Sequence, residues 1–268
     1  MKKLKYSFIK RSKNNNGLTH TLRCITKNNT MTHVKNAEAF ARLVGFCTGY
    51  GGKYNPGRQN LRIENITAQL EEVRQAMGQV TTAKTNFDNE VNHRKQVFDQ
   101  LPRLASSILR TLEASGASAE KLDDARTFVH QITGMAPKSR APIPSGEAQP
   151  AIVKRGRLQL AYVSKADSFS KLVKAVETEP LYIANESTLN IAGLTDKISE
   201  LNEVNQQVAT ARMLWSNSLI GRNEVMYRQS MSLYQAARAV RKYVRAIFGH
   251  DSEQYAQIKN LTFVKPQR

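Results

Sequence analysis

The sequence predicts an all-α protein made of two tandem four-helix-bundle-like repeats, preceded by a basic N-terminal arm or a short β-hairpin. Three observations predict it: an internal repeat, apolar residues at alternating steps of three and four, and a proline-rich basic segment between the two copies. The expected boundaries are 1–31 for the arm or hairpin, 32–135 for helical repeat 1, 136–158 for the linker, 159–265 for helical repeat 2 and 266–268 for a tail.

The internal repeat is clearest between HVKNAEAFARLV (33–44) and YVSKADSFSKLV (162–173). Five apolar residues of the first segment, Val34, Ala37, Phe40, Leu43 and Val44, match Val163, Ala166, Phe169, Leu172 and Val173 at an offset of 129. The match continues at an offset of 128, for example between Tyr54 and Tyr182 and between Arg94 and Arg222. We therefore expect two copies of one helical module.

The first segment of the chain contains eight Lys and Arg and no acidic residue over positions 1–31. Two alternating stretches flank Asn14–Gly17, which is typical of a β-hairpin. A disordered basic arm explains the same composition. The sequence leaves both interpretations open.

The first repeat should contain a long helix between shorter ones. Its seam falls at steps of three and four with one position skipped, along Ile63, Ile66, Leu70, Val73, Met77, Val80, Phe87 and Val91. The shorter helices are expected at 36–47, at 102–115 with a stop at Gly116, and at 118–132 with Ser118 as its cap.

A linker separates the repeats, because four of the chain's eight prolines lie between Gly134 and Gln159. The second repeat then continues with its own long seam along Ile191, Leu194, Ile198, Leu201, Val208, Ala211 and Trp215. Asn205 replaces Met77 in this seam. A polar residue there either fixes the helix register or faces a gap.

Several segments carry a family resemblance. They are YIANESTLNIAGL, RNEVMY, ARAVRKYVRAIFG and SEQYAQIKNLTF in the second repeat and LEASGASAEKLDDA in the first. These motifs resemble an uncharacterised family of bacterial tandem helical-bundle repeat proteins, over roughly residues 32–265. The resemblance implies a tandem four-helix architecture and transfers no catalytic or binding residue, and residues 1–31 lie outside it.

The chain is strongly basic, with a formal net charge of +18. The excess is concentrated in three segments: 1–31 with +8, 136–158 with +4 and 236–268 with +5. Such a distribution is typical of proteins that bind polyanions. A compartment that tolerates basic proteins is the alternative explanation.

The segment AVRKYVRAIFG (239–249) shows the pattern most clearly. Four cations share one helix face at i, i+3, i+4 and i+7, namely Arg238, Arg241, Lys242 and Arg245. Ala237, Val240, Val244 and Ile247 occupy the opposite face, which we expect to be packed. The equivalent helix of the first repeat has Ser106 and Leu109 in place of two of the arginines, so packing alone does not require these charges. A binding face and a merely solvated face both remain open.

The sequence favours a non-enzymatic protein that binds nucleic acid through phosphate contacts with little sequence specificity. DNA is a more expected ligand than RNA, but the sequence leaves the choice between them open. The residues expected to carry this binding are Lys2, Lys3, Lys5, Lys10, Arg11, Lys13, Arg155, Arg157, Arg238, Arg241, Lys242 and Arg245. The alternative is a structural or scaffolding protein that self-assembles into a homo-oligomer or binds a protein partner through its repeats. Asn205 and Trp215 would then be candidate interface residues.

Other kinds of site find little support in the sequence. The scattered histidines and the two cysteines, Cys24 and Cys47, fit no metal spacing, so no metal or cofactor is expected. The glycine-rich stretch 45–57 matches neither the phosphate loop nor the dinucleotide fingerprint and is typical of an inter-helix loop. We expect no catalytic group and no small-molecule substrate. We also expect no export signal and no membrane span, so the predicted location is cytoplasmic.

Overall fold

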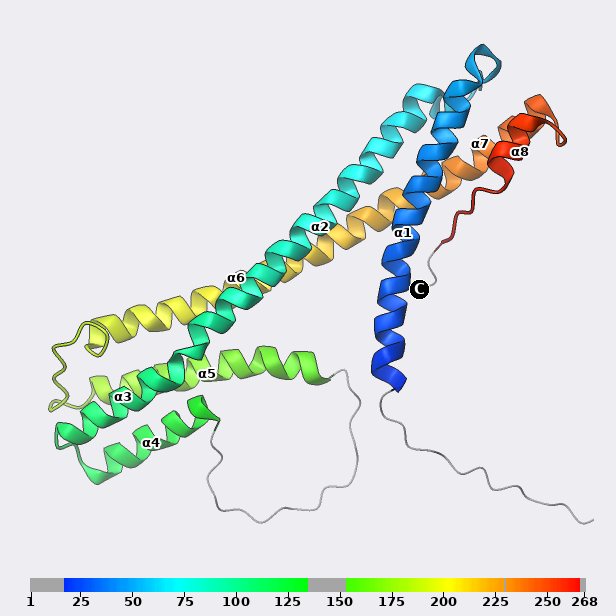
Figure 1. Ribbon diagram of the computed structural model, residues 1–268. Coiled ribbons are helices and arrows are strands. Elements are labelled where there is room, and N and C mark those ends of the chain that lie inside the picture. The colour runs from blue at the N-terminus through cyan, green and yellow to red at the C-terminus, as the bar shows by residue number, and fades with distance from the viewer. Residues whose placement is uncertain (1–16, 135–152, 229, 266–268) are drawn as a thin grey trace, which may run out of the picture. The chain divides into compact units, whose positions relative to one another are not determined.

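The structure, a computed structural model, describes residues 17–134, 153–228 and 230–265, and these residues form helices and loops without a strand (Figure 1). The all-α prediction is confirmed in this part of the chain. The helices are α1 (Gly17–Gly49), α2 (Ile63–Asp99), α3 (Leu101–Ala114), α4 (Ala119–Thr133), α5 (Val153–Glu177), α6 (Ile191–Asn223), α7 (Leu233–Phe248) and α8 (Glu253–Lys259). Short 3₁₀ turns η1 (Gly51–Lys53) and η2 (Gln59–Leu61) precede α2, and a π-helical turn η3 (Glu224–Arg228) follows α6.

The chain divides into two compact units. Unit 1 comprises residues 1–76 and 222–268, and unit 2 comprises residues 77–221. The long helices α2 and α6 contribute residues to both units. Each unit thus combines helices from both expected repeats, with α1, α7 and α8 in unit 1 and α3, α4 and α5 in unit 2.

Unit 2 is built around the packing of α4 on α3 and α5. Helix α3 presents Leu101, Ala105, Ile108 and Leu112 on one buried face, at the three-and-four spacing of an amphipathic helix. Phe169 and Leu172 of α5 join the same core and are fully buried. Removing such apolar side chains from water is the main term that holds the three helices together.

Unit 1 is built around α7, which contacts α1, α8 and the turns η2 and η3. Phe40 and Leu43 of α1, Ile66 of α2, and Val240 and Val244 of α7 have no exposed surface. Phe40 and Leu43 correspond to Phe169 and Leu172 of unit 2 at the offset of 129. The two units therefore bury matching residues of the repeated segment.

Helices α1 and α5 both begin earlier in the chain than the sequence predicts. Helix α1 begins at Gly17, so residues 17–31 are helical and do not form the second strand of a hairpin, while residues 1–16 lie outside the described residues. Helix α5 begins at Val153, so the last part of the expected linker is also helical, and residues 135–152 are not described. Once a packed helix has been nucleated, extending it by further residues costs little, which favours these longer helices.

The local helix signals were predicted correctly at α3 and α4. Ser118 caps α4 and accepts a hydrogen bond from the Lys121 amide at 3.4 Å. Gly116 precedes it with a φ of +79°, a conformation that favours glycine. Within the described residues, no helix combines the length and the apolar character needed to cross a membrane.

The seam of α2 is only partly covered. Ile66, Leu70 and Val73 are buried, whereas Phe87 and Val91 remain half-exposed. The middle of α2 within unit 2, residues 77–93, contains no buried side chain. Asn205, in the matching seam of α6, is half-buried, and its Oδ1 has no hydrogen-bond partner in the described structure. In the described structure this oxygen therefore makes no hydrogen bond through which Asn205 could fix the helix register.

Candidate nucleic-acid interface

Helix α7 has one packed face and one basic face. Its packed face consists of Leu233, Ala236, Ala237, Val240 and Val244, all of them fully buried. Helices α1 and α8 cover this face in unit 1 (Figure 1).

The expectation that Ile247 packs with this face is wrong, because its side chain is 54% exposed. In the last turn of α7 the aromatic contact is made by the next residue, Phe248. Its ring lies 5.2 Å from that of Tyr50 between centroids. Tyr50 is also held by its hydroxyl, which donates to the carbonyl oxygen of Gln254 at 2.8 Å.

Three of the four predicted cations of α7 are exposed, namely Arg238, Lys242 and Arg245. Two of them lie beside aromatic rings. The Cζ of Arg238 is 5.9 Å from the ring centroid of Tyr234, and the Cζ of Arg245 is 5.9 Å from that of Tyr255. At this distance the ring attracts the guanidinium and limits the positions that it samples.

Arg241 has a different environment from its neighbours on α7. It is half-buried, and its guanidinium donates to the carbonyl oxygen of Leu261 and lies 5.6 Å from the ring centroid of Phe263. Its Nε is buried and has no hydrogen-bond partner among the described residues. Arg241 thus fastens the segment after α8 to α7, which leaves it fewer donors for a ligand.

The cations of α7 are not neutralised locally. Across the described residues none of the four forms an ion pair with a carboxylate. In unit 2, by contrast, Arg126 of α4 pairs with Glu113 at 2.9 Å and with Asp123 at 3.0 Å. An unpaired basic face keeps its attraction for an anionic ligand.

Unit 1 also has a more positive net charge than unit 2. Residues 1–76 and 222–268, which make up unit 1, contain 23 Lys and Arg and seven Asp and Glu, a net charge of +16. Residues 77–221, which make up unit 2, contain 17 Lys and Arg and 15 Asp and Glu, a net charge of +2. Most of the positive charge of the chain therefore belongs to unit 1.

The structure brings together only part of the predicted binding set. The four cations of α7 share one helix in unit 1. Arg155 and Arg157 belong to α5, whose residues lie in unit 2. The predicted residues of the N-terminal segment lie outside the described residues, namely Lys2, Lys3, Lys5, Lys10, Arg11 and Lys13.

A buried polar cluster in unit 1 was missed by the sequence reasoning. The hydroxyl of Tyr227 lies 2.8 Å from Nδ1 of His33 and accepts a hydrogen bond from Nδ2 of Asn36 at 2.9 Å. Burial and the nearby Arg222 lower the pKa of His33 to about 4. Asn36 also exchanges hydrogen bonds with the backbone of Val264, at 2.7 and 3.0 Å. The cluster joins α1 to η3 and to the C-terminal segment. A local sequence pattern does not predict such a long-range contact.

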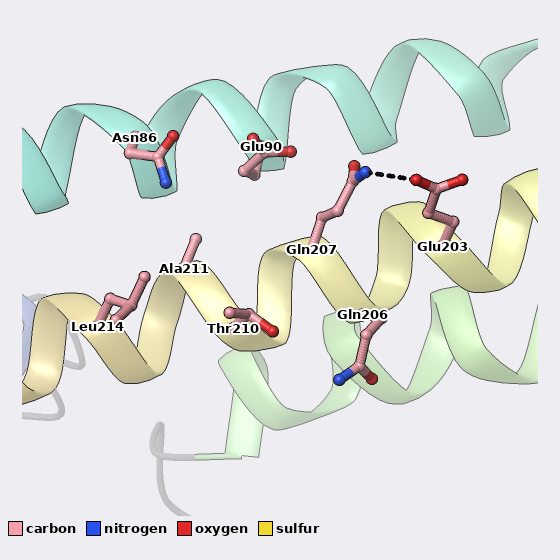
Figure 2. Close-up of a pocket in the computed structure, with 8 residues that line it drawn as sticks. All are labelled: Asn86, Glu90, Glu203, Gln206, Gln207, Thr210, Ala211 and Leu214. Atoms are coloured by element: carbon pink, nitrogen blue, oxygen red, sulfur yellow. Dashed lines mark hydrogen bonds between the residues drawn. The ribbon is translucent and has the colours of Figure 1, made fainter.

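The described surface includes two hollows that bear on ligand binding. One, of about 360 Å³, is lined by residues of α1 and of the segment after α8, namely Lys35, Glu38, Ala39, Arg42, Asn260, Leu261 and Thr262. The other, of about 330 Å³, lies between α2 and α6 in unit 2 (Figure 2). Its lining includes the carboxylates of Glu90 and Glu203, and Gln207 donates to Glu203 at 3.0 Å. Two carboxylates without a basic partner in the lining make this second hollow unfavourable for phosphate.

The described residues contain no group of three or more His, Cys, Asp or Glu side chains arranged to hold a metal ion. Comparison with known proteins gives no match to this chain, whether among family models, curated proteins or solved structures. The resemblance to bacterial tandem helical-bundle proteins therefore rests on the sequence motifs alone.

Proposed function

We propose that this protein is a non-enzymatic, cytoplasmic protein that binds nucleic acid, with DNA a more expected ligand than RNA, through the basic surface of unit 1. The observation that carries the proposal is the exposed row Arg238, Lys242 and Arg245 on one face of α7, which has no carboxylate partner in the described structure. Binding of this kind contacts phosphates and has little sequence specificity.

The spacing of the row suits a phosphate backbone. An α-helix rises about 1.5 Å per residue, so Arg238 and Arg245 are separated by roughly 10 Å along the axis. One strand of duplex DNA carries about three phosphates over that length. In the proposal, the lysines and Arg11 of residues 1–13, together with Arg155 and Arg157, add further phosphate contacts, while Arg241 mainly holds the C-terminal segment in place.

We also propose that both units descend from one repeated helical module whose terminal helices are exchanged between the copies. The support is a set of matching contacts. Tyr54 donates to the carbonyl oxygen of Leu61 at 2.7 Å, and Tyr182 donates to that of Leu189 at 2.8 Å. In this view the copies share their packing, and only the second copy's α7 acquired the basic face.

The proposal is tested by fluorescence anisotropy of labelled DNA and RNA across a series of salt concentrations. Charge reversal in Lys242→Glu and in the double variant Arg238→Glu/Arg245→Glu should weaken binding. With B-form DNA, the slope of log K against log salt should become shallower by about 0.9 for each phosphate that the variant no longer neutralises.

The matched control is Arg110→Glu in α3. Arg110 is exposed and corresponds to Lys242 at the offset of 132, but it lies in unit 2. It should leave the affinity nearly unchanged. Absence of binding to every probe at low salt, or an equal decrease in affinity for Arg110→Glu, would contradict the proposal.

A second candidate function, self-assembly or scaffolding, is favoured by a different observation. Met213, Leu214 and Ile220 of α6 are 50–55% exposed, although all three are large apolar side chains. Trp215 is less suited to such an interface, because it is half-buried and stacks on Phe87 at 5.4 Å between ring centroids. Association through these residues should persist at high salt, where phosphate binding is abolished, and light scattering separates the two functions.

A further inference from the structure

Two tyrosines lie beside the basic face of α7. Tyr234 is in the first turn of α7, four residues before Arg238 and therefore on the same side of the helix. Tyr255 is in α8, where its backbone amide donates to the capping hydroxyl of Ser252 at 3.1 Å. Both side chains are half-buried, so part of each ring faces solvent.

The hydroxyls of these two tyrosines have no hydrogen-bond partner in the described structure. This sets them apart from Tyr50, Tyr54 and Tyr182, whose hydroxyls donate to backbone carbonyl oxygens. A buried tyrosine usually finds a hydrogen-bond partner for its hydroxyl, whereas the half-buried Tyr234 and Tyr255 leave theirs open to solvent or a ligand. The rings of Tyr234 and Tyr255 instead lie next to surface cations, Arg238 and Arg245.

The ring of Tyr255 has a second planar neighbour. His250 lies 5.6 Å from it between ring centroids, and the His250 side chain is 62% exposed. Near the end of α7 the ring of Tyr255 thus has both a second ring and a guanidinium beside it.

In α3, at the offset of 132, Pro102 and Ser106 stand where α7 has Tyr234 and Arg238. Helix α3 nevertheless packs its apolar face in the same way. The tyrosine–arginine pair is therefore not a requirement of this helix packing.

We infer that the ligand of this face is single-stranded nucleic acid, with unpaired bases stacked on the Tyr234–Arg238 and Tyr255–Arg245 pairs and with the phosphates held by Lys242 and the arginines. This inference rests on the proposed function. Aromatic rings and arginine planes interleaved with cations stack on unpaired bases without sequence preference. Bases within a duplex are already stacked and do not reach such rings, so a duplex would use only the cations.

The test uses the full chain and three labelled probes: oligothymidylate, an abasic oligomer of the same length and charge, and a duplex of the same length. The abasic probe keeps the phosphates and removes only the bases. We expect oligothymidylate to bind about tenfold more tightly than the abasic probe for each stacked base, and more tightly than the duplex.

The double variant Tyr234→Leu/Tyr255→Leu should bind oligothymidylate no better than the abasic probe, with the affinity for the abasic probe unchanged. Tyr234→Phe/Tyr255→Phe keeps both rings and should behave as the unmodified protein. Circular dichroism checks that each variant is folded. If the leucine variant does not fold, the comparison of the three probes on the unmodified protein decides the matter.

Equal affinity for oligothymidylate and the abasic probe, or tighter binding of the duplex, would overturn the single-strand inference and leave the proposed function intact. Failure of all three probes to bind at low salt would remove both.

Discussion

Tyr54 donates its hydroxyl hydrogen to the carbonyl oxygen of Leu61 at 2.7 Å, across the loop that leads into α2. Tyr182 makes the same bond to Leu189 at 2.8 Å, before α6. Burial raises the pKa of both tyrosines, so each stays a neutral donor at physiological pH. The two loops differ in their glycine content, and the hydrogen bond is the feature that they share.

Tyr54→Phe and Tyr182→Phe should each lower the free energy of unfolding by about 1 kcal/mol, because each leaves a backbone carbonyl without its partner. Urea denaturation monitored by circular dichroism measures the change. Tyr243→Phe is the control, since the Tyr243 hydroxyl has no hydrogen bond in the described structure while its ring meets that of Tyr54 edge-on at 5.4 Å. An equal decrease in all three variants would count against the role of the two bonds.

Gly193→Ala should destabilise the protein, by roughly 1–3 kcal/mol. A Cβ at position 193 would overlap the carbonyl oxygen of Ser187, and the Gly193 amide donates to Oδ1 of Asn190 at 2.8 Å. Gly78→Ala should instead stabilise α2 by about 1 kcal/mol, because a Cβ there meets no atom within 4 Å and alanine favours helix. Thermal denaturation of the two variants should therefore shift in opposite directions, and a shared direction would contradict this interpretation.

Stability should fall as the pH drops from about 6.5 to about 4. His33 is 5% exposed, and its pKa is lowered from 6.5 to about 4 by burial and by Arg222. The unfolded chain binds this proton more readily than the folded chain within that window, so unfolding is favoured as pH falls and the contribution is complete above pH 6.5. The expected contribution is about 3 kcal/mol.

Urea denaturation at a series of pH values measures this dependence. In His33→Gln the part of the slope between pH 4 and 6.5 that belongs to His33 should disappear. A slope that is the same in the variant and in the unmodified protein would assign the titration to other groups.

Arg241 and Lys242 should separate stability from binding. Arg241→Ala removes the donor to the Leu261 carbonyl and should lower the free energy of unfolding by roughly 1–3 kcal/mol. Lys242→Ala should leave stability within about 0.5 kcal/mol, since it is an exposed surface substitution, and should weaken nucleic-acid binding instead. Denaturation measures the stability of each variant, and anisotropy measures its affinity for nucleic acid. A loss of stability in Lys242→Ala together with a loss of binding alone in Arg241→Ala would contradict the roles given to the two side chains.

The local signals of the sequence determined the helical class and the position of several helices. The three-and-four periodicity of Leu101, Ala105, Ile108 and Leu112 and the cap at Ser118 depend on neighbours only a few residues away. The sequence therefore predicted α3 and α4 to within one or two residues.

Only the tertiary structure decided which helices cover one another. Periodicity marks the apolar face of a helix but carries no information about its partner, so the grouping of α1 with α7 and α8, and of α5 with α3 and α4, could not be predicted. The cluster of His33, Asn36 and Tyr227 was missed for the same reason, because Tyr227 lies more than 190 residues along the chain from the other two.

The basic face of α7 also separates what the sequence determines from what the tertiary structure decides. The sequence alone determined that Arg238, Arg241, Lys242 and Arg245 share one side of a helix, because that follows from 3.6 residues per turn. It treated the four cations alike. Only the tertiary structure, by placing the carbonyl oxygen of Leu261 against Arg241, distinguished a side chain that fastens the fold from three that face solvent.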